Sequence, residues 1–139
     1  MLRQHWADSD ITGLDNSAEM IDAAIKAYPA EKWVLANAAS WIADKPFDLV
    51  FSNAALQWLP DHESLFPHLM SQVALGGALA IQLPAHYQSP LHLITLEVSN
   101  KRSWTDQMDL PRNALTKKKP SFYYEVLQPL SHIPLVMEG

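Results

Sequence analysis

The order of apolar and polar positions predicts strands that alternate with helices over residues 11–84. Short apolar runs indicate the strands, which are Ile11–Leu14, Trp33–Ala36, Phe47–Phe51 and Ala78–Leu83. One helical pattern follows the first strand and another follows the third, and the loops between elements are short. The order β-α-β-β-α-β therefore predicts an α/β fold, with a doubly wound, mostly parallel sheet and helices on both of its faces.

The strand Phe47–Phe51 is the centre of this arrangement. It is nearly continuous in apolar residues and contains neither glycine nor proline, a pattern typical of a parallel strand buried on both faces. The chain leaves the strand at Ser52 and Asn53. Ligands of open α/β sheets bind beyond the carboxyl ends of strands, so this segment is a candidate site.

The first long helix is expected to follow Asp15, which stands at the carboxyl end of the first strand. Asn16 with Glu19 three residues later resembles a capping box, and Pro29 is expected to stop the helix. Positions spaced i, i+3, i+4, i+7 predict its apolar face. These residues are Ile21, Ala24, Ile25 and Tyr28.

Asp61 is expected to cap the second long helix, and Gly76-Gly77 to end it. The apolar face of this helix is expected to consist of Leu65, Leu69, Met70 and Val73.

Weaker patterns flank this core. Met1–Ala7 has the spacing of the last turns of a helix, and Trp41–Pro46 is expected to be a loop or one helical turn. Further elements are expected after Pro84. They are a helix from Pro90 to about Arg102, an exposed loop over Thr105–Pro120, a helix over Phe122–Leu127 and a strand over Ile133–Met137.

Composition narrows the class of protein. A chain of 139 residues is long enough for one domain with its own core, and its net charge of -5 is the opposite of the basic face that nucleic-acid binders carry. Cysteine is absent, which excludes disulfides and thiolate metal sites. Neither a membrane-spanning run nor a signal-peptide region is present in the sequence, so a cytoplasmic location is the default expectation.

The histidines do not form a metal-binding pattern. The sequence contains six, with no i, i+4 pair and no HExxH motif, and no metal site is predicted. His62, His68 and His86 are expected at the surface or in loops. Trp58 and Phe66 are expected to be packing residues. The run Lys117–Lys119 is expected to be a solvated stretch of charge.

Several segments together resemble one enzyme family. The sequence Ile11–Ile21 (ITGLDNSAEMI) is similar to the second-strand motif of class I S-adenosylmethionine-dependent methyltransferases. The resemblance continues through Phe47–Pro60, Asp61–Leu69 and Leu75–Pro84, in the family's order and spacing. Within the family, the chain is most similar to the trans-aconitate 2-methyltransferases.

The resemblance implies a Rossmann-like domain and a set of cofactor contacts in its first half. Asp15 would hold the ribose of S-adenosylmethionine, because a carboxylate only accepts hydrogen bonds and a ribose diol offers two donors. Asn16 and Met20 would line the adenine. Asn37, followed by Ala38, stands where the family usually has an aspartate that accepts from the adenine amino group.

The second half of the predicted site follows the central strand. By the same resemblance, Asn53–Leu56 would pass beside the methionine part of the cofactor, with contacts from Asn53, Ala54 and Leu56. Trp58 would form a wall on the substrate side. Residues 1–139 are expected to form a single partial domain, in which residues 11–84 are the α/β core and residues 85–139 a helical and loop region on the substrate side.

Two features of the family pattern have no counterpart in this sequence. The glycine-rich first motif is absent, and so is the closing antiparallel hairpin. In the family's strand order, the first strand lies between those represented here by Ile11–Leu14 and Phe47–Phe51. The sheet is therefore expected to lack its middle strand and to expose two strand edges, which would allow self-association.

The reaction that the resemblance implies is methyl transfer from S-adenosylmethionine to a carboxylate of a small polycarboxylic acid. A carboxylate is ionised at neutral pH and needs no strong general base, so alignment of the reactants would dominate catalysis and no catalytic residue is assigned. One alternative is another carboxylate substrate, such as a carrier-bound one. A second alternative is a truncated, inactive chain or a module that binds a partner through its open strand edges. Neither nucleic acid nor a membrane is an expected partner.

Overall fold

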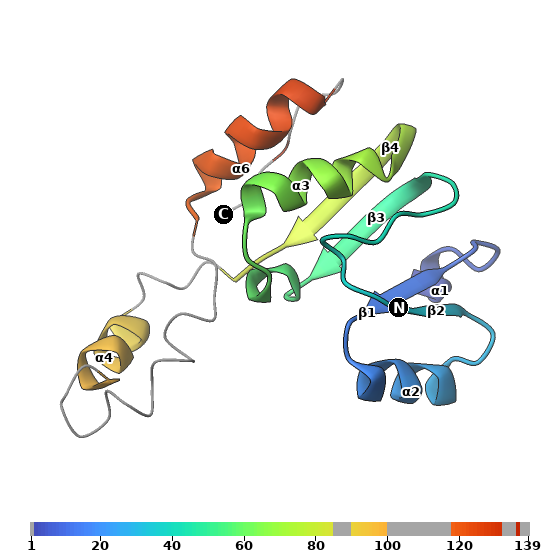
Figure 1. Cartoon of the computed structure of the whole chain (residues 1–139), viewed down its shortest axis with the longest axis horizontal. Coiled ribbons are helices and arrows are strands. Elements are labelled where there is room, and N and C mark those ends of the chain that lie inside the picture. Colours follow the sequence, from blue (N-terminus) through green and yellow to red (C-terminus); the bar gives the residue numbers. More distant parts are fainter. Residues whose placement is uncertain (1, 85–89, 100–117, 132–135, 137–139) are drawn as a thin grey trace. The chain divides into compact units, whose positions relative to one another are not determined.

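The chain divides into two compact units. The computed structural model describes residues 2–84, 90–99, 118–131 and 136 (Figure 1). Residues up to Ile42 form unit 1, and residues from Ala43 onward form unit 2.

Unit 1 contains one pair of parallel strands and one long helix. Its elements are α1 (Leu2–His5), β1 (Thr12–Asp15), α2 (Ala18–Ala27) and β2 (Lys32–Leu35). The strands pair in register from Thr12 opposite Lys32 to Asp15 opposite Leu35, and α2 packs against both strands (Figure 1). Because the strands are parallel, their carboxyl ends lie at the same edge of the sheet.

A glycine allows close packing between these strands. A Cβ atom at Gly13 would overlap the six-membered ring of Trp33, its partner in the neighbouring strand. The Trp33 indole Nε1 donates a hydrogen bond of 2.9 Å to the carbonyl oxygen of Tyr28. The ring is therefore held over β1, in space that only glycine leaves open.

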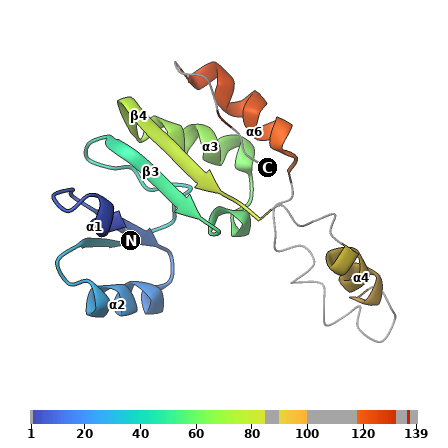
Figure 2. The same ribbon diagram turned by 180° about the vertical axis from the view of Figure 1, so that it is seen from behind.

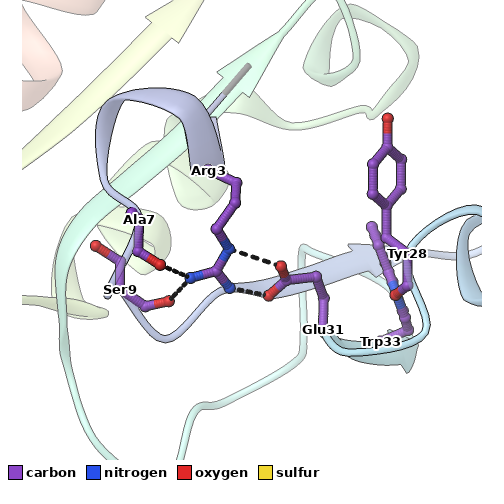
Figure 3. A network of polar contacts seen from close by, with 6 residues as sticks. All are labelled: Arg3, Ala7, Ser9, Tyr28, Glu31 and Trp33. Carbon is purple, nitrogen blue, oxygen red and sulfur yellow. Dashed lines mark hydrogen bonds and ion pairs between the residues drawn. The ribbon is translucent and has the colours of Figure 1, made fainter.

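Arg3 joins the first residues of the chain to the turn before β2 (Figure 3). Its guanidinium pairs with both carboxylate oxygens of Glu31 and donates to the carbonyl oxygens of Ala7 at 2.7 Å and Ser9 at 2.6 Å. The hydrogen bonds that Arg3 donates to the Glu31 carboxylate raise the pKa of Arg3 above its ordinary value. This fork geometry is specific to arginine, so lysine could not replace all of these bonds.

Unit 2 is built on a second pair of parallel strands. Its elements are β3 (Phe47–Asn53), the 3-10 turn η1 (Leu56–Trp58), α3 (His62–Ser71), β4 (Val73–Gln82), α4 (Pro90–Ser99), α6 (Pro120–Leu127) and the 3-10 turn η4 (Gln128–Leu130). Helix α3 lies beside the β3–β4 pair, and α6 lies beside α3, in both views (Figures 1 and 2).

The core of unit 2 lies where α3 meets η1. Its four buried apolar residues are Leu56, Leu65, Phe66 and Leu69. Partly buried residues of β4, of the loops and of α6 surround it, and they are Leu59, Leu79, Ile81, Leu83, Tyr123, Val126 and Leu127. Helix α6 therefore contributes to the same core as the α/β elements, although it follows them by many residues in sequence.

The glycine pair forms an irregular stretch of β4 and does not end a helix. Helix α3 ends at Ser71, and the register with β3 shifts between Val73 and Ala78. Gly76 has a φ of 81°, which favours glycine, and a Cβ at Gly77 would lie 2.8 Å from the carbonyl oxygen of Asp48. The prediction that this pair caps the helix, with Val73 on its face, was wrong because β4 begins at Val73, five residues before the predicted start of the strand at Ala78.

The predicted order of strands and helices is confirmed. Within the described ranges β1 pairs with β2 alone and β3 with β4 alone. The helices expected after Pro90 and over Phe122–Leu127 are present as α4 and α6. Most of the predicted loop over Thr105–Pro120 and most of the predicted strand over Ile133–Met137 lie outside the described residues.

Two predictions about burial were wrong. Phe51 in β3 is 50% exposed, so β3 is not buried on both faces within the described structure. On α2 only Ile21 is buried, at 7% exposure, whereas Ile25 is 45% and Tyr28 64% exposed. The two-stranded sheet of unit 1 is too narrow to cover the whole apolar face that the pattern assigned to α2.

Candidate functional site

Asp15 lies at the carboxyl end of β1, where α2 is about to begin. Its Oδ1 accepts a hydrogen bond of 2.8 Å from the backbone N–H of Ser17, and its carbonyl oxygen accepts from Ala36 N at 2.9 Å. These bonds fix both the side chain and the backbone of Asp15. In the part of the chain that the structure describes, Oδ1 alone of the two carboxylate oxygens accepts a hydrogen bond, which leaves Oδ2 able to accept from a ligand.

The N-cap of α2 is Ser17, and not Asn16 as the sequence pattern indicated. The Ser17 Oγ accepts from the backbone N–H of Met20 at 3.3 Å. The Asx turn of Asp15 directs the backbone of Ser17 into the cap position, one residue later than predicted. Asn16 is consequently exposed and takes no part in the cap.

The other site residues predicted in unit 1 lie near the carboxyl ends of β1 and β2. Met20, in the first turn of α2, is 53% exposed. Asn37 and Ala38 follow β2, whose carboxyl end adjoins that of β1. The Asn37 Oδ1 accepts from Ala39 N at 2.9 Å, so a ligand would have to share this oxygen, which has two lone pairs.

The site residues predicted in unit 2 follow the carboxyl end of β3. Asn53 is the last residue of the strand, opposite Gln82, and Ala54 N donates to the Gln82 carbonyl oxygen at 3.0 Å. Trp58 is 61% exposed and is therefore not a packing residue. Leu56 is 5% exposed and belongs to the core, so its side chain faces away from any ligand at the surface.

The segment after β3 stores backbone strain. Ala54 has a φ of 51° and Asp61 a φ of 53°, a region that residues with a Cβ rarely adopt. The Asp61 side chain accepts from Ser64 N and caps α3, as predicted. Strain of this kind costs about 1–3 kcal/mol per residue and tends to occur at functional sites.

A buried amide beside this strained turn lacks one of its hydrogen bonds. Gln57 is 5% exposed, and its Nε2 donates to the Ala54 carbonyl oxygen at 2.7 Å. That bond fixes the orientation of the amide, because in the flipped amide Oε1 of Gln57 would face the carbonyl oxygen of Ala54, and two acceptors would repel each other. Among the described residues, Gln57 Oε1 has no hydrogen-bond partner, although a buried acceptor normally has one.

Replacing Ala54 with glycine is expected to stabilise unit 2 by about 0.5–1 kcal/mol, because the relief of the positive φ exceeds the entropic cost of glycine. The matched control is Ala55→Gly. Ala55 has a φ of -118°, so glycine relieves nothing there and should destabilise by about 0.5 kcal/mol. Urea denaturation measures both changes, and the same sign for the two variants would contradict the role of strain at Ala54.

His62 is 1% exposed, so the prediction that it lies at the surface or in a loop was wrong. The spacing of the buried residues of α3 contains the missing signal. His62, Leu65, Phe66 and Leu69 follow i, i+3, i+4, i+7, and all of them are buried. The predicted face of this helix was displaced from the buried one, although Leu65 and Leu69 belong to both.

Comparison with known proteins identifies the class. A family model described as a methyltransferase domain matches residues 1–81, more than half of the chain. The chain therefore belongs to the methyltransferase domain family, and the resemblance inferred from the sequence motifs is confirmed. In this family, the mixed α/β architecture with parallel strands corresponds to a Rossmann-like fold.

The chain is similar to curated proteins named trans-aconitate 2-methyltransferase. It is 41% identical to that of Klebsiella pneumoniae (strain 342) over 107 residues, which are 77% of this chain and 42% of that protein. It is 36% identical to that of Azoarcus sp. (strain BH72) over 129 residues, which are 93% of this chain and 50% of that protein. The chain thus spans about half the length, or less, of these relatives.

The described residues contain neither a membrane-spanning helix nor a cluster of metal-ligating side chains. No helix among them is both long and apolar enough to cross a membrane. Nor do three or more histidine, aspartate and glutamate side chains in those ranges gather where they could hold a metal ion.

Proposed function

We propose that this chain is part of an S-adenosylmethionine-dependent methyltransferase that transfers a methyl group to a carboxylate of a small polycarboxylic acid, of the trans-aconitate type. The observation that carries the proposal is the placement of Asp15. Its carboxylate is held at a strand end by Ser17 N–H, and its Oδ2 remains able to accept from a ribose hydroxyl. The names of the relatives support the choice of substrate class.

The residues of unit 1 would bind the nucleoside part of the cofactor. Asp15 accepts from the ribose diol, Asn16 and Met20 lie along the adenine, and Asn37 with Ala38 meets the adenine amino group. Most of these side chains are exposed at the carboxyl ends of β1 and β2, where ligands of parallel sheets bind.

The residues of unit 2 would bind the reacting end. Asn53 and Ala54 pass beside the methionine part, and exposed Trp58 borders the substrate. S-adenosylmethionine supplies an electrophilic methyl group, and a substrate carboxylate is already ionised at neutral pH. The work of the protein is then to align the two reactants and exclude water, so that no general base is needed.

A calorimetric titration of the chain with S-adenosylhomocysteine tests the proposal. We expect a dissociation constant on the order of 1–100 micromolar. We expect weaker binding of the 2′-deoxy analogue, because it lacks one of the hydroxyls that Asp15 would accept from. Circular dichroism shows whether the chain is folded under the same conditions. A folded chain that releases no heat of binding would contradict the proposal.

The open edge of β3 favours a second candidate function. Among the described residues β3 pairs in a sheet with β4 alone, and an edge strand of this kind can be extended by a further strand. In this case the chain would act as a module that binds a partner by strand addition. Sedimentation of the chain at increasing concentration separates the two candidates, since strand addition between copies would raise the mass whether or not a cofactor analogue is present.

A further inference from the structure

His62 is the most deeply buried large side chain among the described residues, with 1% exposure. It is the first residue of α3, directly after the N-cap Asp61. Both of its ring nitrogens have partners. Nε2 lies 2.9 Å from the carbonyl oxygen of Leu56 in η1, and Nδ1 lies 2.8 Å from the hydroxyl of Tyr123 in α6.

These partners determine which nitrogen carries the proton. The Leu56 carbonyl oxygen can only accept, so Nε2 must be the donor. In the neutral ring Nδ1 is then an acceptor, and the Tyr123 hydroxyl donates to it. A directed chain of hydrogen bonds therefore runs from Tyr123 in α6, through His62, to the backbone of η1.

The bond to Leu56 acts on the backbone of the turn itself. The same carbonyl oxygen accepts from Leu59 N at 3.0 Å, so both of its lone pairs are engaged. The strained residue Ala54 lies two residues before η1, and the exposed Trp58 is the last residue of η1. A turn of three residues has few bonds of its own, and one further bond is a large part of what holds it.

Tyr123 is held in place by its ring as well as by its hydroxyl. Its ring lies 4.7 Å from that of Phe66 and 5.7 Å from that of His62, centroid to centroid. Its neighbour Tyr124, in the same helix, is 47% exposed. The aromatic contacts would survive the loss of the hydroxyl, so packing and hydrogen bonding can be separated by a single substitution.

We infer that His62 and Tyr123 are positioning residues that let helix α6 set the shape of residues 54–58, and through them the affinity of the site. This inference rests on the proposed function in one respect, namely that residues 54–58 contact the cofactor. The two residues touch no ligand in this scheme. They act by holding the carbonyl group of Leu56, and with it the turn that presents Ala54 and Trp58.

Hydrogen–deuterium exchange of the whole chain without ligand tests the inference, with Tyr123→Phe as the variant. Exchange of the peptide 54–60 is expected to accelerate about fivefold, the factor that corresponds to one hydrogen bond of about 1 kcal/mol. The peptide 65–71, in the same helix as His62, is expected to be unchanged. The matched control is Tyr124→Phe, which removes the hydroxyl of a half-exposed tyrosine from the same helix and should alter neither peptide.

A second pair of variants tests the histidine. Glutamine at this position can place an amide N–H near the site of Nε2, so His62→Gln should retain most of the protection of the peptide 54–60. His62→Leu cannot donate and should lose it. Equal exchange of that peptide in the unaltered chain and in Tyr123→Phe would overturn the inference, and so would a parallel acceleration of both peptides, which indicates general loosening.

Titration of the same variants with S-adenosylhomocysteine links the turn to the site. Tyr123→Phe is expected to weaken binding by about fivefold, and Tyr124→Phe to leave it unchanged. Failure of the unaltered chain to bind would overturn the proposed function alone, because the exchange measurement needs no ligand. Unchanged affinity in Tyr123→Phe, despite faster exchange of the turn, would overturn the link between α6 and the site.

Discussion

The variant Asp15→Asn is expected to bind S-adenosylhomocysteine about 10- to 100-fold more weakly than the unaltered chain. Asparagine keeps an oxygen for the hydrogen bond from Ser17 N, so the turn into α2 is retained. The variant loses the charge and replaces one acceptor by a donor. A hydrogen bond to a charged group is worth about 1.5–3 kcal/mol, and each 1.4 kcal/mol changes affinity about tenfold.

The control for charge is Asp22→Asn. Asp22 is exposed on α2, the helix that follows Asp15, and its replacement changes the net charge by the same amount. It is expected to leave affinity unchanged. Calorimetry on both variants decides the matter, since a general electrostatic effect would weaken both equally and would remove the reason for assigning the ribose to Asp15.

Replacing Phe66 with alanine is expected to destabilise unit 2 by about 3–5 kcal/mol, the usual cost of removing a large aromatic side chain from a core. Phe66 is 2% exposed and packs among Leu56, Leu65 and Leu69. It also contacts the rings of His62 and Tyr123, at 5.2 and 4.7 Å between centroids. Its loss would leave a cavity at the contact between α3 and α6.

Phe51→Ala makes the same chemical change at a site that is 50% exposed. Its expected cost is about 1 kcal/mol, because much of this side chain is already in contact with water. Urea denaturation, monitored by a spectroscopic signal from unit 2, compares the stabilities of the two variants. Phe66→Leu, which fills more of the space, provides an intermediate value if the alanine variant does not fold. Equal losses at positions 51 and 66 would contradict the assignment of the core.

The sequence alone predicted the order of the strands and helices and several of the residues at which they begin or end. Runs such as Phe47–Phe51 are too short and too apolar to be surface helices, and Asp61 has the chemistry of an N-cap that the structure confirms. Asp15 was recognised because an acidic residue between a strand and a helix has a defined place in the family pattern. Its role in the site remains a proposal.

The missed features depend on contacts between distant residues. A surface position for His62 was a reasonable expectation, because nothing near it in sequence supplies the hydroxyl of Tyr123. Similarly, the sequence pattern of Gly76 and Gly77 is that of a helix cap. In the folded chain β3 lies alongside, and the carbonyl oxygen of Asp48 is too close to allow a Cβ at position 77. Local patterns cannot contain these partners, which are brought together only by folding.

The division of the chain between Ile42 and Ala43 also determines what a measured stability means. A single free energy of unfolding is defined only when a chain passes between two states in one cooperative transition. Unit 1 has its own strand pair and helix, and unit 2 has its own core. Each contains the contacts needed for a separate transition. We therefore expect a melting curve of the whole chain to average two transitions, and the free-energy changes expected at Ala54 and Phe66 are those of unit 2.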